Sequence, residues 1–245
     1  MVGSVGKRIN EIRDQWHTKK HPFFTSMLDG SLDLKALGIY MGYHHQFVAR
    51  AQPAFGLMYY HAPMDVREAL VENLAEEHGM SAIPGEGNKP HDHNEMIFRF
   101  CRAAGLSDDE VRNTPMSPAW VGRNLHYVEC LREEAVGVAL AMQATQEGQQ
   151  VALNEEVTIP SFIKHYGYTK ESPEIEFFVE HAVADLEHSE RQLALCEKYL
   201  DTPELVDRAV VVCEEAVRLR WASITDLYRR YVLKEADILP PGIAA

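Results

Sequence analysis

FFVEHAVADLEHSE, residues 177–190, places polar side chains where a helix would be expected to bury its apolar face. At about 100° per residue, one face of a helix in this region collects the apolar residues Phe177, Phe178, Ala184, Leu195 and Tyr199. His181, Asp185 and His188 fall in the middle of that face, at successive spacings of four and three residues. Their side chains are therefore predicted to project together into the interior of a helical protein.

A bound metal ion would explain why such polar groups are buried together. An ionised carboxylate and two imidazoles lose several kcal/mol of hydration on burial unless each is paired. Imidazole nitrogens and carboxylate oxygens ligate the same cations. We therefore interpret the set as a metal site, and the rival interpretation is a solvated acidic face that includes Glu180, Glu187 and Glu190.

A second anomaly is Glu147, which interrupts an apolar helical face formed by Leu140, Ala144 and Val151. Taken alone, Glu147 would be interpreted as a surface glutamate, because glutamines at positions 146, 149 and 150 indicate a polar patch. Together with the first three residues it becomes a candidate carboxylate ligand.

The third anomaly is the pair Glu77 and His93. Glu77 continues the helical face of Val66, Leu70 and Leu74. On one continuous helix the sixteen-residue separation would place Glu77 and His93 nearly opposite each other, so the proline-marked break at 84–90 is needed for them to face one site. Spacing alone leaves four neighbours open as alternative ligands: Glu76, His78, His91 and Glu95.

These anomalies add up to three imidazoles and three carboxylates from four predicted helices: Glu77, His93, Glu147, His181, Asp185 and His188. Six such ligands suit two metal ions. Nitrogen and oxygen donors without thiolate favour iron, with manganese as the alternative, over structural zinc. Two such ions in a helical bundle are a usual setting for dioxygen chemistry. We therefore expect two Fe²⁺ ions that react with O₂.

Helix-start signals recur along the rest of the chain, whereas alternating strand patterns are hardly found. Asp92 precedes one predicted helix, and Ser117, Ser172 and Thr202 each stand before a proline suited to a first helical turn. No flexible linker or repeat interrupts the pattern, so residues 1–245 are predicted to form one all-α domain of about seven or eight helices. The predicted ranges include 32–51, 66–78, 96–104, 118–153, 173–200 and 203–234.

The composition limits the partners. The 37 acidic and 24 basic residues give a formal charge of -13, which repels nucleic-acid phosphates and anionic lipid surfaces. No apolar run approaches the roughly 20 residues needed to cross a bilayer, and residues 1–7 lack the apolar stretch of a signal peptide. We expect no nucleic acid or membrane partner, and a cytoplasmic location. The four scattered cysteines are predicted to be core residues.

Residues 177–190 resemble the signature of the haem-oxygenase-like diiron oxidases. Related groups that share this helical fold are pyrroloquinoline quinone synthase, thiaminase II and the chlamydial protein associating with death domains. The metal-free synthase lacks the complete ligand set in the corresponding region, so the full set here favours a metal. NLAEEHG at 73–79 and HNEMIFRF at 93–100 resemble the glutamate and histidine pair of the family and favour Glu77 and His93 as ligands. Further motifs extend the resemblance over most of the chain: HPFF at 21–24, YMGYHHQ at 40–46, EGQ at 147–149 and HYG at 165–167.

The resemblance implies a haem-oxygenase-like helical bundle and an O₂-dependent non-haem diiron oxidoreductase. Its substrate would be a small, often amino-acid-derived molecule that undergoes desaturation, C–C cleavage or N-oxygenation, and the enzyme would be a homodimer. By the same analogy Tyr43, His44 and Tyr166 line the pocket. A substrate carboxylate needs a cationic donor, and the candidates that lie close in sequence to the predicted site segments are Arg191, Arg220 and Lys164.

Three alternatives remain at this point. The first is a cofactor-independent oxidase on the same fold, similar to pyrroloquinoline quinone synthase, in which histidine and glutamate act as acid and base. The second is a self-sacrificing enzyme that donates one of its own tyrosines to a product, as the chlamydial relative suggests. The third is a non-enzymatic interaction protein that uses its helices as a binding surface.

Overall fold

The chain is a bundle of α-helices joined by short turns. The computed structural model describes residues 4–80, 92–182 and 184–236, apart from the side chains of Ser4 and residues 184–190. Within those ranges the only β-type pairing is a single bridge between His78 and Asp92, so the predicted all-α class is confirmed. The α-helices are α1 (Ser4–Gln15), α2 (Pro22–Leu28), α3 (Leu34–His61), α4 (Met64–Glu77), α5 (His93–Ala103), α6 (Asp108–Asn113), α7 (Pro118–Glu133), α8 (Val136–Glu147), α9 (Gln150–Leu153), α10 (Ile159–His165), α11 (Glu176–His181), α12 (Ala184–Tyr199) and α13 (Pro203–Leu227).

Side-chain caps fix where several helices begin. Asp92 accepts a hydrogen bond from the backbone N of Asn94 at 2.8 Å, and Thr202 accepts one from the backbone N of Leu205 at 3.3 Å. Both are caps that the sequence predicts. Ser117 and Ser172 also precede their helices as predicted, but neither side chain makes a cap hydrogen bond. The cap of α3 is Asp33, which is why α3 begins at Leu34 instead of at residue 32, where the predicted range 32–51 starts.

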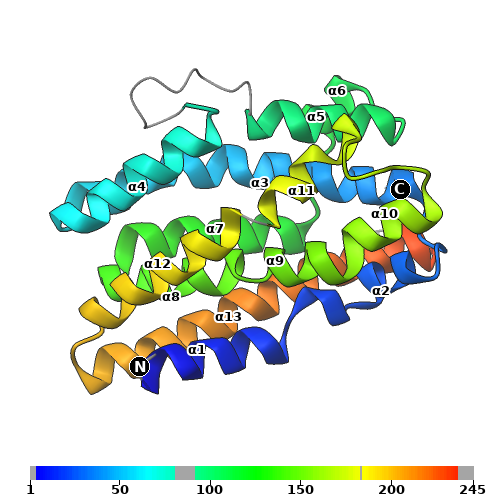
Figure 1. Cartoon of the computed structure of the whole chain (residues 1–245). Helices are drawn as coiled ribbons and strands as arrows, with labels where there is room; N and C mark the ends of the chain where they lie inside the picture. The colour runs from blue at the N-terminus through cyan, green and yellow to red at the C-terminus, as the bar shows by residue number, and fades with distance from the viewer. Residues whose placement is uncertain (1–3, 81–91, 183, 237–245) are drawn as a thin grey trace, which may run out of the picture.

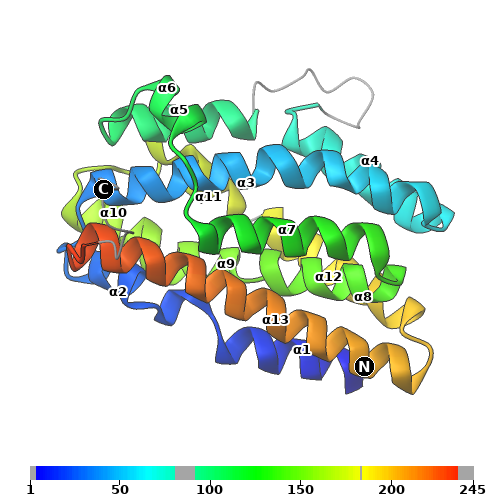
Figure 2. The same ribbon diagram turned by 180° about the vertical axis from the view of Figure 1, so that it is seen from behind.

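The helices run mostly along one direction in stacked layers, as Figures 1 and 2 show from opposite sides. α8 packs between α12 and α13, while α7 packs between α3 and α13. α1 lies alongside α13 at one edge, and α5, α6 and α4 pack against α3 at the other. α4, α5, α8 and α11, which carry predicted ligands, all contribute residues to one cavity.

Aromatic side chains fill the core between these layers. Trp120 of α7 is fully buried and contacts Tyr40 and Tyr43 of α3 edge-on, at ring-centroid distances of 5.8 and 5.6 Å. Phe162 of α10 is equally buried and packs 4.9 Å from Phe178 of α11. Burial of such side chains stabilises the fold by about 2–3 kcal/mol each.

Two of the long predicted helices are interrupted, so the structure has more helices than the sequence predicts. The range 118–153 is divided into α7, α8 and α9, with breaks after Glu133 and Glu147. The range 173–200 begins as a short 3-10 helix, Pro173–Ile175, and is then divided between α11 and α12 after His181. A π-helix, Asn154–Thr158, joins α9 to α10, and another, Tyr228–Val232, extends α13. Periodicity therefore identified the helices but not their breaks.

α3 differs from the prediction in the other direction, because it continues through Pro53 to His61 instead of ending at Ala51. An interior proline removes one backbone hydrogen bond and costs about 3 kcal/mol. The residues that follow, Ala54, Phe55 and Met58, are buried against the core. Their burial offsets the loss and keeps the chain helical.

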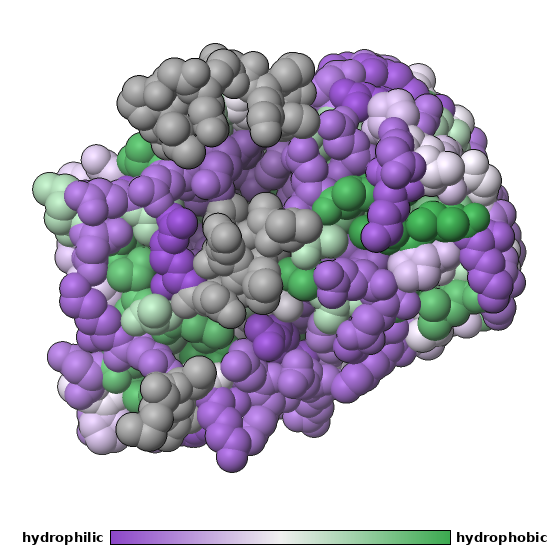
Figure 3. Space-filling view, viewed as in Figure 1, coloured by the Kyte–Doolittle hydropathy of each residue, from purple (hydrophilic) through white to green (hydrophobic). Residues whose placement is uncertain are grey.

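The surface is mixed in polarity, and the cysteines are buried as the sequence predicts. Figure 3 shows a face in which hydrophilic residues predominate and apolar residues form separate patches. Within the described ranges no helix combines the length and the apolar character that a membrane crossing needs. All four cysteines are buried as free thiols, and burial raises the pKa of Cys101 to about 12. Such thiols are core residues, as predicted.

Candidate metal centre

Glu77 and His93 meet where α4 ends and α5 begins. The neighbouring residues His78 and Asp92 form the antiparallel bridge that brings the two helix ends together. His93 Nδ1 lies 3.1 Å from Glu77 Oε2, and Gln52 of α3 donates a hydrogen bond from Nε2 to the same oxygen at 3.0 Å. The two residues therefore face each other despite their sixteen-residue separation.

The described alternatives to this pair lie elsewhere. Glu76, His78 and Glu95 are exposed, and Glu95 forms an ion pair with Arg102 at 2.8 Å. His91 is outside the described residues. Among the described candidates, only Glu77 and His93 line the central cavity.

His181 is the last residue of α11 and lies beside His93, with the ring centroids 4.5 Å apart. Its Nδ1 lies 2.7 Å from the carbonyl oxygen of Phe177. A carbonyl oxygen can only accept, so Nδ1 carries the hydrogen and the lone pair of the neutral ring is on Nε2. This backbone contact is the arrangement that commonly orients a histidine ligand.

Glu77, His93 and His181 form a cluster whose geometry fits a metal ion. One ligand atom from each residue lies within 4.8 Å of the other two. Atoms that bind one ion at about 2.1 Å can lie at most about 4.2 Å apart, so small side-chain movements would suffice. Two imidazoles and a carboxylate suit iron, manganese or zinc, and the absence of thiolate favours the first two.

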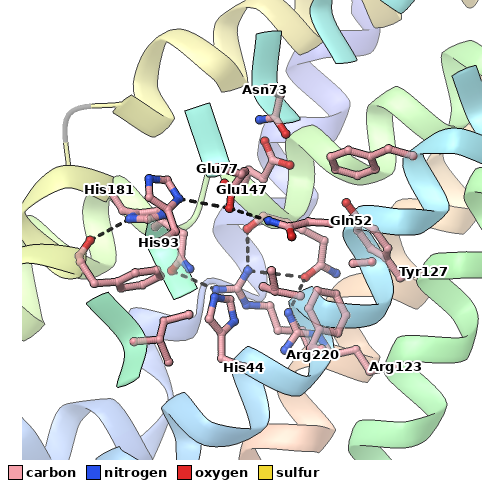
Figure 4. Close-up of a pocket in the computed structure, with 18 residues that line it drawn as sticks. His44, Gln52, Asn73, Glu77, His93, Arg123, Tyr127, Glu147, His181 and Arg220 are labelled. Carbon is pink, nitrogen blue, oxygen red and sulfur yellow. Dashed lines mark hydrogen bonds and ion pairs between the residues drawn. The ribbon is translucent and has the colours of Figure 1, made fainter. Parts of the chain in front are cut away.

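Glu147, the last residue of α8, lines the same cavity (Figure 4). Gln192 of α12 donates a hydrogen bond from Nε2 to Glu147 Oε2 at 2.6 Å, which fixes the orientation of the carboxylate. The remaining predicted ligands, Asp185 and His188, belong to α12, and their side chains are outside the described part of the structure.

Electrostatics link Glu77 and His93 as an ion pair. Burial alone would raise the pKa of Glu77, but the hydrogen bond with His93 and the nearby imidazoles lower it to about 2. Burial alone would lower the pKa of His93, but Glu77 and then Glu180 raise it. For His44, burial and then the charge of Arg123 hold the pKa well below its ordinary value, so this ring is neutral.

The cavity beside the cluster has a volume of about 100 Å³ and mixed walls. Phe47, Phe55 and Ile97 supply apolar surface, and His44 and Tyr127 line it as well. A volume of this size is enough for one small organic molecule or several waters. The site therefore combines candidate ligands with room for a substrate.

The remaining predicted site residues are placed as follows. Arg220 lines the cavity. Tyr43 donates a hydrogen bond to the carbonyl oxygen of Pro115 at 2.9 Å, and Tyr166 donates one to the carbonyl oxygen of Leu32 at 2.8 Å; neither tyrosine is among the cavity-lining residues. Arg191 forms an ion pair with Glu72 at the surface, and Lys164 is exposed.

The structure also adds cavity residues that the sequence interpretation missed, chiefly Gln52, Arg123 and Tyr127. Arg123 follows Trp120 by three residues and precedes Tyr127 by four. The pattern that singled out Glu147, a charged residue on an apolar helical face, therefore occurs in α7 too. Gln52 carries no comparable signal, since a glutamine beside a proline is common at a helix end.

Comparison with known proteins gives a family and two named relatives. A family model described as iron-containing redox enzyme matches residues 40–221. The chain is 23% identical over 236 residues to a 4-aminobenzoate synthase from Nitrosomonas europaea, covering 92% of this chain and 91% of that protein. It is 24% identical over 194 residues to a 4-aminobenzoate synthase from Chlamydia muridarum, covering 78% and 76% of the two chains.

Solved structures with the same fold were also found. A domain of unknown function with a heme oxygenase-like fold from Shewanella denitrificans superposes with a TM-score of 0.70 at 17% identity, over 96% of both chains. A TenA homolog from Pseudomonas syringae pv. tomato gives a TM-score of 0.71 at 11% identity, over 92% of this chain and 93% of that one. The predicted haem-oxygenase-like architecture is thereby confirmed.

Proposed function

This chain belongs to the family of iron-containing redox enzymes, and we propose that it is an O₂-dependent diiron oxidase acting on a small, amino-acid-derived molecule. The observation that carries the proposal is the cluster of Glu77, His93 and His181, with ligand atoms within 4.8 Å of one another beside a cavity. Glu147 lines that cavity. We propose that Asp185 and His188 of α12 complete a set of six ligands.

Two bound iron ions would supply the redox chemistry that activates dioxygen. The chain contributes the setting for this chemistry. Gln52 and Gln192 hold the carboxylates of Glu77 and Glu147 through hydrogen bonds of 3.0 and 2.6 Å. The contact with Phe177 keeps the proton of His181 on Nδ1, away from the cluster. Apolar walls limit the entry of water, which strengthens the electrostatic interactions inside the cavity.

The relatives narrow the choice of reaction. The two proteins named 4-aminobenzoate synthase carry a product name that describes an aromatic ring with one amino and one carboxylate group. A cavity of about 100 Å³ lined by Phe47, Phe55 and Tyr127 suits a compact molecule of this kind. We therefore propose that the first reaction to test is formation of an aromatic ring that carries one amino and one carboxylate group.

A self-sacrificing reaction is the second candidate, and the position of Tyr127 favours it. Tyr127 is the one tyrosine among the described cavity-lining residues, and its hydroxyl accepts a hydrogen bond from Gln143 Nε2 at 3.3 Å. Burial, followed by the charge of Glu147, raises the pKa of this hydroxyl, so the ring is neutral. If this candidate is correct, intact-mass spectrometry before and after one turnover would show a loss of mass, and peptide mapping would locate it at Tyr127.

Anaerobic titration with Fe²⁺ tests the main proposal. We expect the unaltered chain to bind about two ions and to develop an O₂-dependent optical change. His181→Gln should bind less iron and lose that change, because one ligand is removed from the cluster. His126→Gln is the matched control, since His126 lies in α7 and contacts Glu215 at 3.5 Å, away from the cluster.

Three outcomes would contradict the proposal. Absence of iron binding by the unaltered chain would favour the cofactor-independent enzyme. Unchanged iron binding and unchanged optical response in His181→Gln would show that the cluster is not the metal centre. If His181→Gln keeps the activity of the protein in cells, the alternative of a non-enzymatic interaction protein would be favoured.

A further inference from the structure

A buried arginine lines the cavity on the side away from His93 and His181 (Figure 4). Arg123 of α7 is only 5% exposed, and its guanidinium group lies between the rings of Phe47 and Trp120, at 4.4 and 5.0 Å from their centroids. Nε and Nη1 have no hydrogen-bond partner in the part of the chain that the structure describes. A buried cation held in this way is costly unless an anion joins it.

A second buried arginine reaches the same place. Arg220 of α13 is 3% exposed, and Figure 4 shows Arg123 and Arg220 approaching the cavity side by side. Both guanidinium groups share one neutral acceptor, Gln146 Oε1, at the long distances of 3.3 and 3.5 Å. Burial, and then the positive charge of Arg220, lower the pKa of Arg123 to about 9. Arg220 is also held by hydrogen bonds to the carbonyl oxygen of Gln146 at 2.5 Å and to Gln150 Oε1 at 3.3 Å. For Arg123, the amide oxygen at 3.3 Å is the one acceptor among the described residues, which leaves Nε and Nη1 of Arg123 unsatisfied.

We propose that Arg123 and Arg220 form a carboxylate-binding subsite, at which the acid group of a small apolar or aromatic substrate replaces Gln146 as the shared acceptor. Guanidinium groups bind carboxylates through strong, charge-assisted hydrogen bonds. Gln146 is a side chain that can rotate, and its amide oxygen offers less charge than a carboxylate oxygen. Phe47 and Phe55, which line the cavity, would pack against the body of the molecule.

The subsite would set the orientation of the substrate. The candidate metal ligands Glu77, His93 and His181 line the same cavity as the two arginines. A molecule held by its acid group at the arginines would point its other end toward the metal cluster. This consequence rests on the proposed function, whereas binding of the carboxylate does not.

Isothermal titration calorimetry with benzoate and benzamide tests the subsite. The two probes have nearly the same shape and differ in charge. They are titrated into the full chain loaded anaerobically with Fe²⁺ and into the same chain after chelation, because a carboxylate could also bind iron directly. We expect benzoate to bind both forms at least about tenfold more tightly than benzamide, since a charged hydrogen bond contributes about 1.5–3 kcal/mol, or roughly 10- to 150-fold.

Substitutions of Arg123 test whether this arginine binds the carboxylate of benzoate. Arg123→Gln should weaken benzoate binding by about tenfold or more and leave benzamide unchanged, and Arg123→Lys should give an intermediate affinity. Arg112→Gln is the matched control, because Arg112 also lies 4.4 Å from a phenylalanine ring, that of Phe98, but does not line the cavity. If Arg123→Gln does not fold, the comparison of the two probes in the unaltered chain still decides.

The proposal is overturned if benzoate and benzamide bind the chelated chain equally. It is also overturned if benzoate binds only the iron-loaded form and Arg123→Gln binds it as tightly as the unaltered chain does. Iron content is measured on the same samples, so failure of the diiron proposal is recognised separately. A chain that binds benzoate through Arg123 but takes up no iron would retain the subsite and lose only the proposed oxidase.

Discussion

Replacing His21 with asparagine should remove one defined part of the acid sensitivity of the fold. His21 is 1% exposed, and its Nδ1 accepts a hydrogen bond from the backbone N of Phe23 at 3.0 Å, which caps α2. Its Nε2 lies 2.9 Å from Thr225 Oγ1 of α13. The Thr225 hydroxyl donates to the carbonyl oxygen of Trp221, so Nε2 must be the donor to Thr225. A proton on Nδ1 would therefore replace the cap acceptor with a donor.

The loss of stability on acidification follows from the pKa of His21. Burial lowers the pKa of His21 from 6.5 to about 4. Because the folded-state pKa is the lower one, this contribution to stability is complete above about pH 6.5 and is lost as the pH falls to about 4. At 1.36 kcal/mol per pKa unit, the loss between about pH 7.5 and 4.5 is about 2.5 kcal/mol.

Urea denaturation of the chelated protein at the two pH values measures this loss. Asparagine keeps a cap acceptor but does not titrate, so His21→Asn should lose about 2.5 kcal/mol less than the unaltered chain on acidification. Comparing the two proteins cancels the contributions of other groups, including His17, whose pKa burial lowers to about 3. If His21→Asn and the unaltered chain lose the same stability on acidification, protonation of His21 is not the cause of the loss.

Two further predictions concern packing and the metal site. Gly137→Ala should destabilise the fold by about 1–3 kcal/mol in thermal or urea unfolding, because its new Cβ would lie 2.7 Å from backbone atoms of Tyr199. The control Gly122→Ala, with no atom within 4 Å of its Cβ, should instead stabilise α7 by up to about 1 kcal/mol. Equal effects of the two substitutions on stability would contradict the close packing of α8 on the end of α12. Gln52→Leu removes the hydrogen bond to Glu77 and should weaken Fe²⁺ binding by about 10- to 100-fold without unfolding the chain. If the variant binds iron as tightly as the unaltered chain does, the hydrogen bond from Gln52 is not needed to orient Glu77.

The sequence predicted most of the fold because helix periodicity and caps are local signals. Asp92 and Thr202 cap the helices that the sequence assigns to them. Polar residues on apolar faces also led to Glu77 and Glu147, which line the cavity. The continuation of α3 through Pro53 could not be predicted in this way, since it depends on the burial of Phe55 and Met58 against distant helices.

The candidate site was harder to predict because its residues lie at helix ends. Glu77, Glu147 and His181 are the last residues of α4, α8 and α11, and His93 is the first residue of α5. A helical wheel assumes that the helix continues, and it therefore assigns a face to a residue such as His181 without locating the break that follows.

The same helix ends bear on the chemistry of the site. The carboxyl end of a helix carries a partial negative charge from its unpaired carbonyl groups, whereas the amino end carries a partial positive charge. Of the four candidate ligands whose side chains the structure describes, three stand at carboxyl ends and one at an amino end. The helix dipoles therefore add to the carboxylates of Glu77 and Glu147 in favouring a cation. The breaks that periodicity did not reveal place the ligand-bearing side chains at those ends, where a metal ion would gain most from the backbone.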